Sequence, residues 1–219
     1  MRQNEGRKED PKEARKEGGE TRCPWCEKSD AYRRYHDEEW GAPIVDEQAL
    51  YELFLLECFQ AGLSWLTILD KRENFRSAFA NFDRDAIKNF GESDVKRLMA
   101  DPGIIRHEGK IRAAIENARR LDGVIDQYGG LVPYFWRQVG NKAVVGQWAG
   151  TSEIPVRSAQ SDLLSKDLKK RGFAFVGSVT VHSLLQAAGL FDDHVAACFR
   201  KPPLAVLRKR MGIGEQSPA

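Results

Sequence analysis

Apolar side chains recur at helical spacing through most of the chain, and the alternation typical of strands is scarce. Residues that cap helices mark the breaks in this pattern: Asp46 precedes the first long apolar stretch, and Gly62 follows it. The pattern predicts helices over residues 46–61, 64–82, a short stretch after 83, 93–100, 109–128, 158–171 and 178–188, with a loop over 141–155. We therefore expect an all-α fold.

Composition is consistent with a folded protein that stays inside the cell. Hydrophobic residues make up 42% of the 219 residues, enough for a buried core in one large domain or two small lobes. No run of roughly 18 apolar residues is present, so we expect no membrane span. The charged, acid-rich N-terminus argues against a signal or transit peptide. We expect a cytoplasmic protein whose four cysteines are thiols or metal ligands.

The two ends of the chain differ from its middle. Residues 1–22 alternate basic and acidic side chains with almost nothing apolar, which predicts a disordered charged extension. We expect residues 203–219 to form a loose tail, which leaves 23–202 as the folded domain. The net charge of +2 indicates no partner, but Lys169 and Lys170 belong to a basic cluster suited to DNA phosphates. A solvated face is the plainer alternative.

Two pairs of metal-ligand residues lie far apart in the sequence. Cys23 and His36 belong to an N-terminal loop, and His194 and Cys198 are spaced so that one face of a helix would carry both. Two Cys and two His form a common closed zinc set, which here would tie the two ends of the chain together. Coincidence or plain burial is the alternative. Cys26 also forms a Cys-x-x-Cys pair with Cys23, which is typical of a zinc half-site or a redox pair.

One carboxylate lies where the core should be. Glu57 follows Leu53 and Phe54 on the same face of a helix that is apolar nearly all round. Burying an unpaired carboxylate costs several kcal/mol, and buried acids with perturbed pKa values cluster at functional sites. We interpret Glu57 as a functional acid; a structural acid satisfied by backbone donors or by a buried Arg is the alternative.

Aromatic residues accompany Glu57 in the sequence. Trp25, Tyr35 and Trp40 lie in the N-terminal loop, and Trp65 follows the helix of Glu57. Such rings would suit a planar, cationic ligand through stacking and cation–π attraction. The alternative is that they are plain core.

A tight turn separates two predicted helices. Gly103 and Gly109 bracket it, and Ile105, Arg106 and Lys110 lie within or beside it. In a helix-hairpin-helix unit, backbone N–H groups of such a turn hold a DNA phosphate without reading sequence. Pro and Gly between helices also occur in ordinary loops.

Five runs are specific enough to compare with known families. They are Tyr35-His36-Asp37-Glu38-Glu39-Trp40-Gly41, Gln60-Ala61-Gly62-Leu63-Ser64-Trp65, Gly103-Ile104-Ile105-Arg106-His107, Lys169-Lys170-Arg171-Gly172-Phe173 and Asp193-His194-Val195. Together, in this order, they resemble the 3-methyladenine DNA glycosylase I family of helix-hairpin-helix glycosylases. The resemblance extends from about residue 22 to residue 202.

The resemblance implies a helix-hairpin-helix glycosylase fold and a monofunctional enzyme. Such an enzyme flips 3-methyladenine out of double-stranded DNA and hydrolyses its glycosidic bond, leaving an abasic site. It implies one structural zinc ion, away from the chemistry, bound by Cys23, His36, His194 and Cys198. Cys26 is outside this ligand pattern. The family lacks the catalytic Asp of related glycosylases, and no matched run assigns that role to Asp122 or Asp126.

The resemblance also implies that Glu57 recognises the base and that aromatic residues shape the pocket, and with the candidates from spacing and charge this gives three groups of predicted site residues. The catalytic group is Glu57, Tyr35 and Trp65, and the base-binding group is Trp25, Trp40 and Gln60. The DNA-binding group is Leu63, Gly103, Ile105, Arg106, Gly109, Lys110, Lys169 and Lys170. Leu63 is the one large apolar residue of its turn, so it could fill the gap left by a flipped base or simply pack inward. We expect a bacterial, nucleoid-associated monomer.

Two other function classes are considered. A non-catalytic damage-binding protein would have no need for a buried acid. A zinc hydrolase would need an open metal position, which a complete Cys2His2 set does not leave.

Overall fold

The structure, a computed structural model, describes residues 20–218. Most of the extension that we expected to be disordered, residues 1–19, lies outside this range. Residues 20–22 lie against the body of the protein. The Arg22 guanidinium donates to both carboxylate oxygens of Asp37 at 2.8–3.0 Å, and the Phe199 N–H donates to the Thr21 carbonyl at 2.9 Å. The folded chain therefore includes Thr21 and Arg22.

Helices form most of the described chain, as expected. They are α1 (Asp30–Glu38), α2 (Glu47–Gln60), α3 (Trp65–Leu69), α4 (Arg72–Ala78), α5 (Arg84–Ile87), α6 (Glu92–Ala100), α7 (Glu108–Tyr128), α8 (Leu131–Trp136), α9 (Ala159–Lys170), α10 (Ser178–Ala187) and α11 (Lys201–Arg210). Single 3-10 turns are η1 (Pro24–Lys28), η2 (Ala80–Phe82), η3 (Arg137–Val139) and η4 (Thr151–Glu153). In the part of the chain that the structure describes, no helix is long and apolar enough to cross a membrane.

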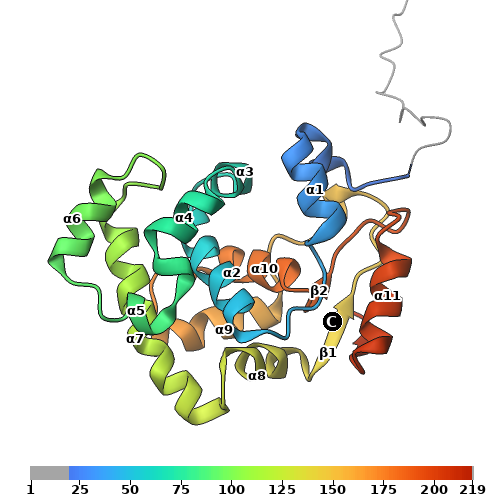
Figure 1. The fold of residues 1–219 in the computed structure, drawn as a ribbon. Coiled ribbons are helices and arrows are strands. Elements are labelled where there is room, and N and C mark those ends of the chain that lie inside the picture. The colour runs from blue at the N-terminus through green and yellow to red at the C-terminus, as the bar shows by residue number, and fades with distance from the viewer. Residues whose placement is uncertain (1–19, 219) are drawn as a thin grey trace, which may run out of the picture.

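Helix α2 lies at the centre of the fold and packs against α10, α7 and α8 (Figure 1). Asp46 caps it by accepting from the Ala49 N–H at 2.8 Å, as predicted. Its C-terminal carbonyls are paired as well: the Lys110 ammonium donates to the carbonyls of Phe59 and Ala61 at 2.8 and 2.7 Å. Gly62 then turns the chain with a φ of +78°, a conformation that favours glycine. The helix that carries Glu57 is therefore fixed along its length and at both ends.

The helix predicted over 64–82 is divided into α3, α4 and η2. Ser64 does cap α3, but the chain bends at Lys71, and residues 80–82 all have positive φ values. Gln48 on α2 donates to the carbonyls of Asn81 and Phe82, both at 2.9 Å, which pairs backbone groups that a helix would otherwise pair. A contact distant in sequence thus ends this helix.

Helices α1 and α8 were not expected. The predicted N-terminal loop contains η1 and α1, and Ser29 caps α1 by accepting from the Tyr32 N–H. Helix α8 follows Gly130, and its first N–H groups, those of Leu131 and Val132, donate to the Glu47 carboxylate at 2.7 and 2.9 Å. In α8, a side chain from α2 replaces a local cap.

A small sheet corrects the all-α expectation to a mostly helical fold. Strands β1 (Lys142–Val145), β2 (Phe191–Asp192) and β3 (Gly214–Gln216) are parallel, with β1 in the centre. Val144 is opposite Phe191 on one side and Gln216 on the other. Strand β1 lies in the segment that we predicted to be a loop. Four residues are too short for a recognisable alternation, so pairing with distant strands decides this structure.

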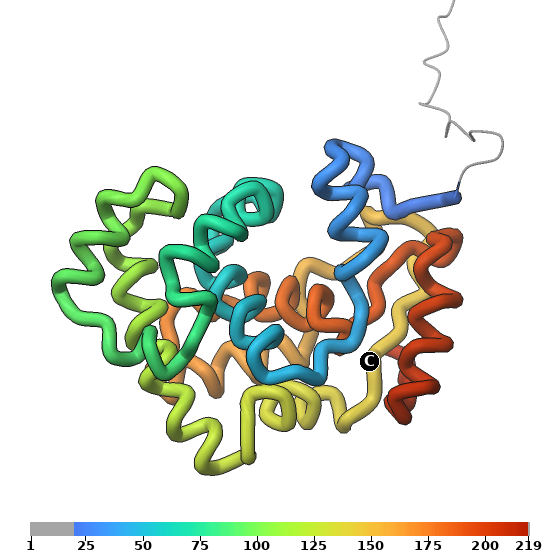
Figure 2. The backbone as a smooth tube through the Cα atoms, in the orientation of Figure 1, coloured from blue at the N-terminus to red at the C-terminus, as the bar shows by residue number. Residues whose placement is uncertain are grey.

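The C-terminal segment is not the loose tail that we expected. Strand β3 brings the end of the chain against β1, and the residues just before α11 lie beside the N-terminal segment, as the tube in Figure 2 shows. Leu204 and Arg208 are buried. The Arg208 guanidinium donates to Asp192 at 2.8 Å and to Glu215 at 2.7 Å. This buried ion pair holds α11 against β2.

Arg208→Ala leaves the buried Asp192 carboxylate with only the more distant Lys201 ammonium, at 3.6 Å, as a counter-charge. We expect it to lower the free energy of unfolding by about 3 kcal/mol, because removing one partner of a buried ion pair uncovers the desolvation cost of the other. Urea denaturation measures this loss. The exposed Lys209→Ala should change stability by less than about 0.5 kcal/mol. Equal effects of the two substitutions would contradict the anchoring role of Arg208.

Candidate active site

A cavity of about 360 Å³ opens beside the C-terminal half of α2. Its size is in the usual range for a small-ligand site. Aromatic residues of η1, α1 and α3 form one part of its wall, and α10 and the segment around η4 form another. The lining residues are Trp25, Tyr32, Tyr35, Trp40, Glu57, Gln60, Trp65, Thr151, Ile154, Pro155, Val156, Val179, Ser183, Gln186 and Ala187. The six residues predicted to contact the base therefore all lie at one cavity.

The aromatic side chains are held against one another. Trp25 meets Trp40 edge to face with ring centroids 5.0 Å apart, and Tyr35 lies 5.4 Å from Trp65. Tyr32 packs edge to face on Trp25, and its hydroxyl accepts from the Leu66 N–H at 3.0 Å, which links α1 to α3. Rings fixed in this way present a preformed apolar wall to a planar ligand.

Glu57 lies in this wall with only 3% of its surface exposed. Within residues 20–218, no hydrogen-bond donor reaches its buried Oε2 atom. Burial therefore raises the pKa of the Glu57 carboxyl well above its ordinary value. The pKa of Tyr35 is also raised, first by burial and then by the negative charge of Glu57. The alternative of a structural acid paired with an Arg or with backbone donors is not what the described residues show.

A buried donor lacks a partner in the same cavity. The Trp65 indole N–H is buried, and within the described range no acceptor pairs with it. Buried polar groups are nearly always paired, so an unpaired acceptor and an unpaired donor in one cavity indicate a site for a polar ligand. Such a ligand would offer both a hydrogen-bond donor and an acceptor, as a nucleobase does.

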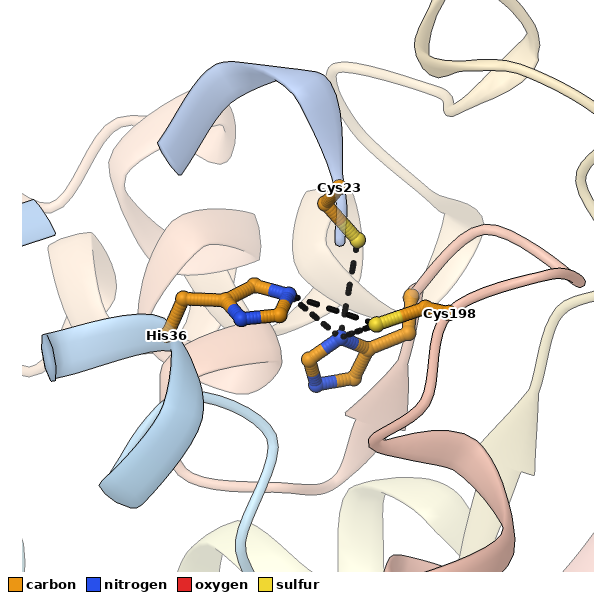
Figure 3. Close-up of side chains that lie close together, drawn as sticks. Cys23, His36 and Cys198 are labelled. Carbon is orange, nitrogen blue, oxygen red and sulfur yellow. Dashed lines mark hydrogen bonds between the residues drawn. The ribbon is translucent and has the colours of Figure 1, made fainter. Parts of the chain in front are cut away.

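Four metal-ligand residues come together beside this cavity. One ligand atom from each of Cys23, His36, His194 and Cys198 lies within 4.8 Å of the others, and all four side chains are buried. Figure 3 shows Cys23, His36 and Cys198 directed toward a common point. His36 Nε2 lies 3.4 Å from the Cys198 sulfur and 3.2 Å from His194 Nδ1. The sequence prediction thus identified a set of residues that the fold places together.

The local structure of the second pair differs from the prediction. His194 and Cys198 do not lie on a helix: the chain runs extended from β2 to Val195, which bridges to Trp148, and then turns. The Ala196 N–H donates to the Trp148 carbonyl at 2.8 Å, so strand-like pairing has taken the backbone groups that a helix needs.

The environment of the cluster suits a metal. The second ring nitrogen of each histidine is occupied, that of His36 by Asp37 at 2.8 Å and that of His194 by the Trp40 carbonyl at 3.1 Å. Such partners orient ligating imidazoles. The hydrogen bond that the two thiols share lowers the pKa of Cys198 and raises that of Cys23.

Cys26 does not belong to the cluster. It is fully buried, and burial raises the pKa of its thiol to about 12, which keeps it protonated. The cluster is also closer to the cavity than we expected. The His36 ring packs edge to face on Trp25 at 5.5 Å and lies parallel to Trp40 at 6.3 Å. The four residues therefore support the aromatic wall directly.

The predicted hairpin joins α6 and α7. Gly103 donates its N–H to the Asp101 carboxylate at 2.7 Å, and a side chain at this position would come within 3.0 Å of Asn74. His107 caps α7 by accepting from the Lys110 N–H at 3.2 Å. The N–H groups of Glu108 and Gly109, at the start of α7, have no acceptor within the described chain.

Other predicted DNA-binding residues vary in exposure. Arg106, Lys169 and Lys170 are exposed, Ile105 is half-buried, and Leu63 is 41% exposed in the turn between α2 and α3. Lys110 differs from the prediction, because its ammonium is buried and donates to the carbonyls at the end of α2. It fixes the helix that carries Glu57 and does not face solvent.

Asp122 and Asp126 lie away from the cavity. Both are exposed, and Asp122 pairs with Arg84, which lowers the pKa of its carboxyl. The cavity also includes residues that sequence reasoning missed. Val179, Ser183, Gln186 and Ala187 follow helical spacing on α10, and this periodicity was the signal that could have found them.

Fold and cavity together define a mostly helical protein with a preformed aromatic site for a planar ligand. Residues 25–201 match the model of the family described as methyladenine glycosylase. The chain is 47% identical over 177 residues to DNA-3-methyladenine glycosylase 1 of Escherichia coli (strain K12), which covers 81% of this chain and 95% of that protein. The chain belongs to the methyladenine glycosylase family.

Solved structures agree with this assignment. A crystal structure of 3-methyladenine DNA glycosylase I is 45% identical, has a TM-score of 0.78, and covers 82% of this chain and 98% of that one. A structure of the glycosylase from Staphylococcus aureus, described as the structural basis of 3-methyladenine recognition, is 39% identical. Its TM-score is 0.80, and it covers 83% of this chain and 96% of that one.

The raised pKa of Glu57 predicts a pH-dependent stability. The folded protein keeps this proton at pH values at which the unfolded chain releases it, so stability falls as pH rises from the ordinary value of 4.5 toward the folded pKa. The Glu57→Gln variant has no carboxyl at this position, so its stability does not fall with pH for this reason. The difference in unfolding free energy between Glu57→Gln and the wild type should grow in favour of the variant by up to about 1.4 kcal/mol per pH unit in this window.

Urea denaturation between about pH 5 and pH 8 measures that difference. The matched control is Glu38→Gln, which removes an exposed carboxylate of α1 that does not line the cavity. A flat difference for Glu57→Gln would mean that Glu57 is ionised in the folded protein, contrary to its burial.

Proposed function

We propose that this protein is a monofunctional DNA glycosylase that excises 3-methyladenine from alkylated double-stranded DNA by hydrolysis and leaves an abasic site. One observation carries the proposal: a buried, unpaired carboxylate in an aromatic cavity of nucleobase size. The names of the relatives point to the same substrate. A base inside a duplex cannot reach such a cavity, so the enzyme flips the nucleotide out of the stack.

Charge explains how the cavity selects the damaged base. Adenine that carries a methyl group on a ring nitrogen is cationic while it is attached to DNA. In the free cavity, burial raises the pKa of the Glu57 carboxyl well above its ordinary value. An entering cation offsets the desolvation cost of the carboxylate, so the ionised form of Glu57 is favoured and accepts a charge-assisted hydrogen bond from the base. Tyr35, Trp25 and Trp65 stack on or border the ring.

The chemistry needs little acid catalysis. A water oxygen attacks C1′ of the sugar while the glycosidic C–N bond breaks, and the bonding electrons neutralise the departing cationic base. The attacking water releases its proton, and the free base leaves uncharged. Because the leaving group is already activated, positioning and selective binding of the base account for the rate acceleration. No catalytic Asp is needed beside the sugar. This agrees with the positions of Asp122 and Asp126, which do not line the cavity.

Contacts with the DNA backbone come from the hairpin. We assign the N–H groups of Glu108 and Gly109, together with Arg106, to a phosphate near the lesion. Gly103 and Ile105 shape this turn, and Lys169 and Lys170 add attraction that depends on salt and not on sequence. Leu63 fills the gap in the duplex. Lys110 acts from within the protein by fixing the end of α2.

We infer that Cys23, His36, His194 and Cys198 hold one zinc ion. Two sulfur and two nitrogen ligands form a closed tetrahedral set, so the ion stabilises the fold and takes no substrate. It would join η1 and α1 to the segment after β2, and it would thereby fix Tyr35, which is adjacent to His36. We further propose a monomer that acts in the bacterial cytoplasm on nucleoid DNA, as its bacterial relatives suggest.

The function is tested by base release from alkylated DNA in single turnovers, with the wild type and Glu57→Gln. The amide keeps the shape of Glu57 but loses its charge, so we expect 3-methyladenine excision to fall about 10- to 100-fold, the equivalent of about 1–3 kcal/mol. Glu38→Gln should excise at the wild-type rate. A folded Glu57→Gln with wild-type excision would remove Glu57 from the site, and a wild type that binds damaged DNA without releasing base would be a damage-binding protein.

Elemental analysis tests the metal, and we expect one zinc per chain. Cys198→Ala should lose the ion and several kcal/mol of stability, because a structural zinc ion contributes directly to folding. Cys26→Ser, which changes a buried cysteine outside the cluster, is the control and should keep its zinc. Wild-type protein that is purified without chelators and contains no zinc would refute the assignment. Loss of zinc from Cys26→Ser would instead favour the Cys-x-x-Cys alternative.

A further inference from the structure

Gln186 lies on the wall of the cavity formed by α10. It is half-buried, and it follows Val179 and Ser183 along the same helical face. Its carboxamide carries one donor group and one acceptor atom, so its orientation decides which of them a ligand would meet. The contacts of the amide with Asp193 fix this orientation.

Asp193 holds the donor side of the amide. The Gln186 Nε2 group donates to Asp193 Oδ2 at 2.8 Å, and the Trp148 indole N–H donates to Asp193 Oδ1 at 2.7 Å. Asp193 is only 1% exposed, and the His182 ring lies 3.7 Å from Oδ2. Since a carboxylate only accepts hydrogen bonds, the nitrogen of Gln186 must face Asp193. A flipped amide would place two acceptors in contact.

The acceptor side of the amide is left open. Within residues 20–218, no donor reaches Gln186 Oε1, and this atom is not among the buried polar atoms that lack a partner. The oxygen is therefore accessible, and it belongs to a residue that lines the cavity. A residue on the α10 wall of the cavity thus carries an accessible acceptor whose orientation Asp193 fixes, in addition to the Glu57 carboxyl on α2.

We propose that Gln186 Oε1 accepts a hydrogen bond from the exocyclic amine of the bound base and so selects adenine over guanine, with Asp193 as its positioning residue. This inference rests on the proposed function and deepens it. Adenine carries an amine donor at the position where guanine carries a carbonyl acceptor. Because Asp193 prevents the amide from flipping, a guanine carbonyl would meet a second acceptor and lose a hydrogen bond.

Gln186→Leu tests the proposal because it removes the acceptor and keeps a side chain of similar size. Two readouts are needed: single-turnover release of 3-methyladenine and 3-methylguanine from alkylated DNA, and binding of the two free bases followed by tryptophan fluorescence. We expect release and affinity for 3-methyladenine to fall about 10-fold, and those for 3-methylguanine to change less, so that the preference for adenine decreases. Gln186→Met, which keeps the unbranched chain, should behave in the same way.

The matched control is Gln138→Leu. It also removes one side-chain amide hydrogen bond, from Gln138 to the Tyr134 carbonyl at 3.0 Å, but it lies outside the cavity. Thermal unfolding shows whether each variant is folded. A folded Gln186→Leu or Gln186→Met with an unchanged base preference, or with equal losses for both bases, overturns the proposal. A wild type that binds 3-methyladenine selectively but releases none overturns the proposed catalysis, and the binding readout then decides the role of Gln186.

Discussion

The structure depends on one costly constraint, the burial of the Glu57 carboxyl without a hydrogen-bond partner in the described chain. The free energy for this burial comes from α2, which is apolar nearly all round and packs against α10, α7 and α8. Lys110 pairs the carbonyls at the end of this helix, so α2 cannot unwind to bring Glu57 into water. A helix with a weaker core or a frayed end would release the carboxylate and lose the site.

The opposite wall of the cavity is fixed from the two ends of the chain. Cys23 and His36 hold η1 and α1 against the segment of His194 and Cys198. That segment follows β2, where Asp192 pairs with the buried Arg208 of α11. The aromatic wall and the amide of Gln186 therefore depend on contacts between residues that lie more than 150 positions apart, such as His36 and His194. Small shifts in this lobe would move ligand contacts on α1 and α10 together.

Local pattern was sufficient for some of these features and not for others. Glu57 was predictable because a single charge interrupts an apolar helix, and the four metal-ligand residues because their types and family motifs are distinctive. Lys110 was interpreted as a DNA contact because its carbonyl partners lie 49 and 51 positions away. Arg208 lies in the predicted loose tail, because its buried partner Asp192 is 16 positions earlier in the chain and outside that segment. The division of the predicted helix over 64–82 depends on Gln48, which no local pattern includes.

Under the proposed function, the raised pKa of Glu57 makes charge the first criterion of recognition. An undamaged adenine is neutral, so it does not offset the cost of ionising the buried Glu57 carboxyl. A methylated base brings a positive charge into a site from which water is excluded, where the attraction between opposite charges is much stronger than in solvent. The attraction between Glu57 and the base therefore contributes to binding only when the base is methylated. An acceptor fixed on α10 adds a second criterion, because it distinguishes between two cationic bases by their exocyclic groups. Charge thus separates damaged from undamaged bases, and hydrogen-bond polarity separates one damaged base from another.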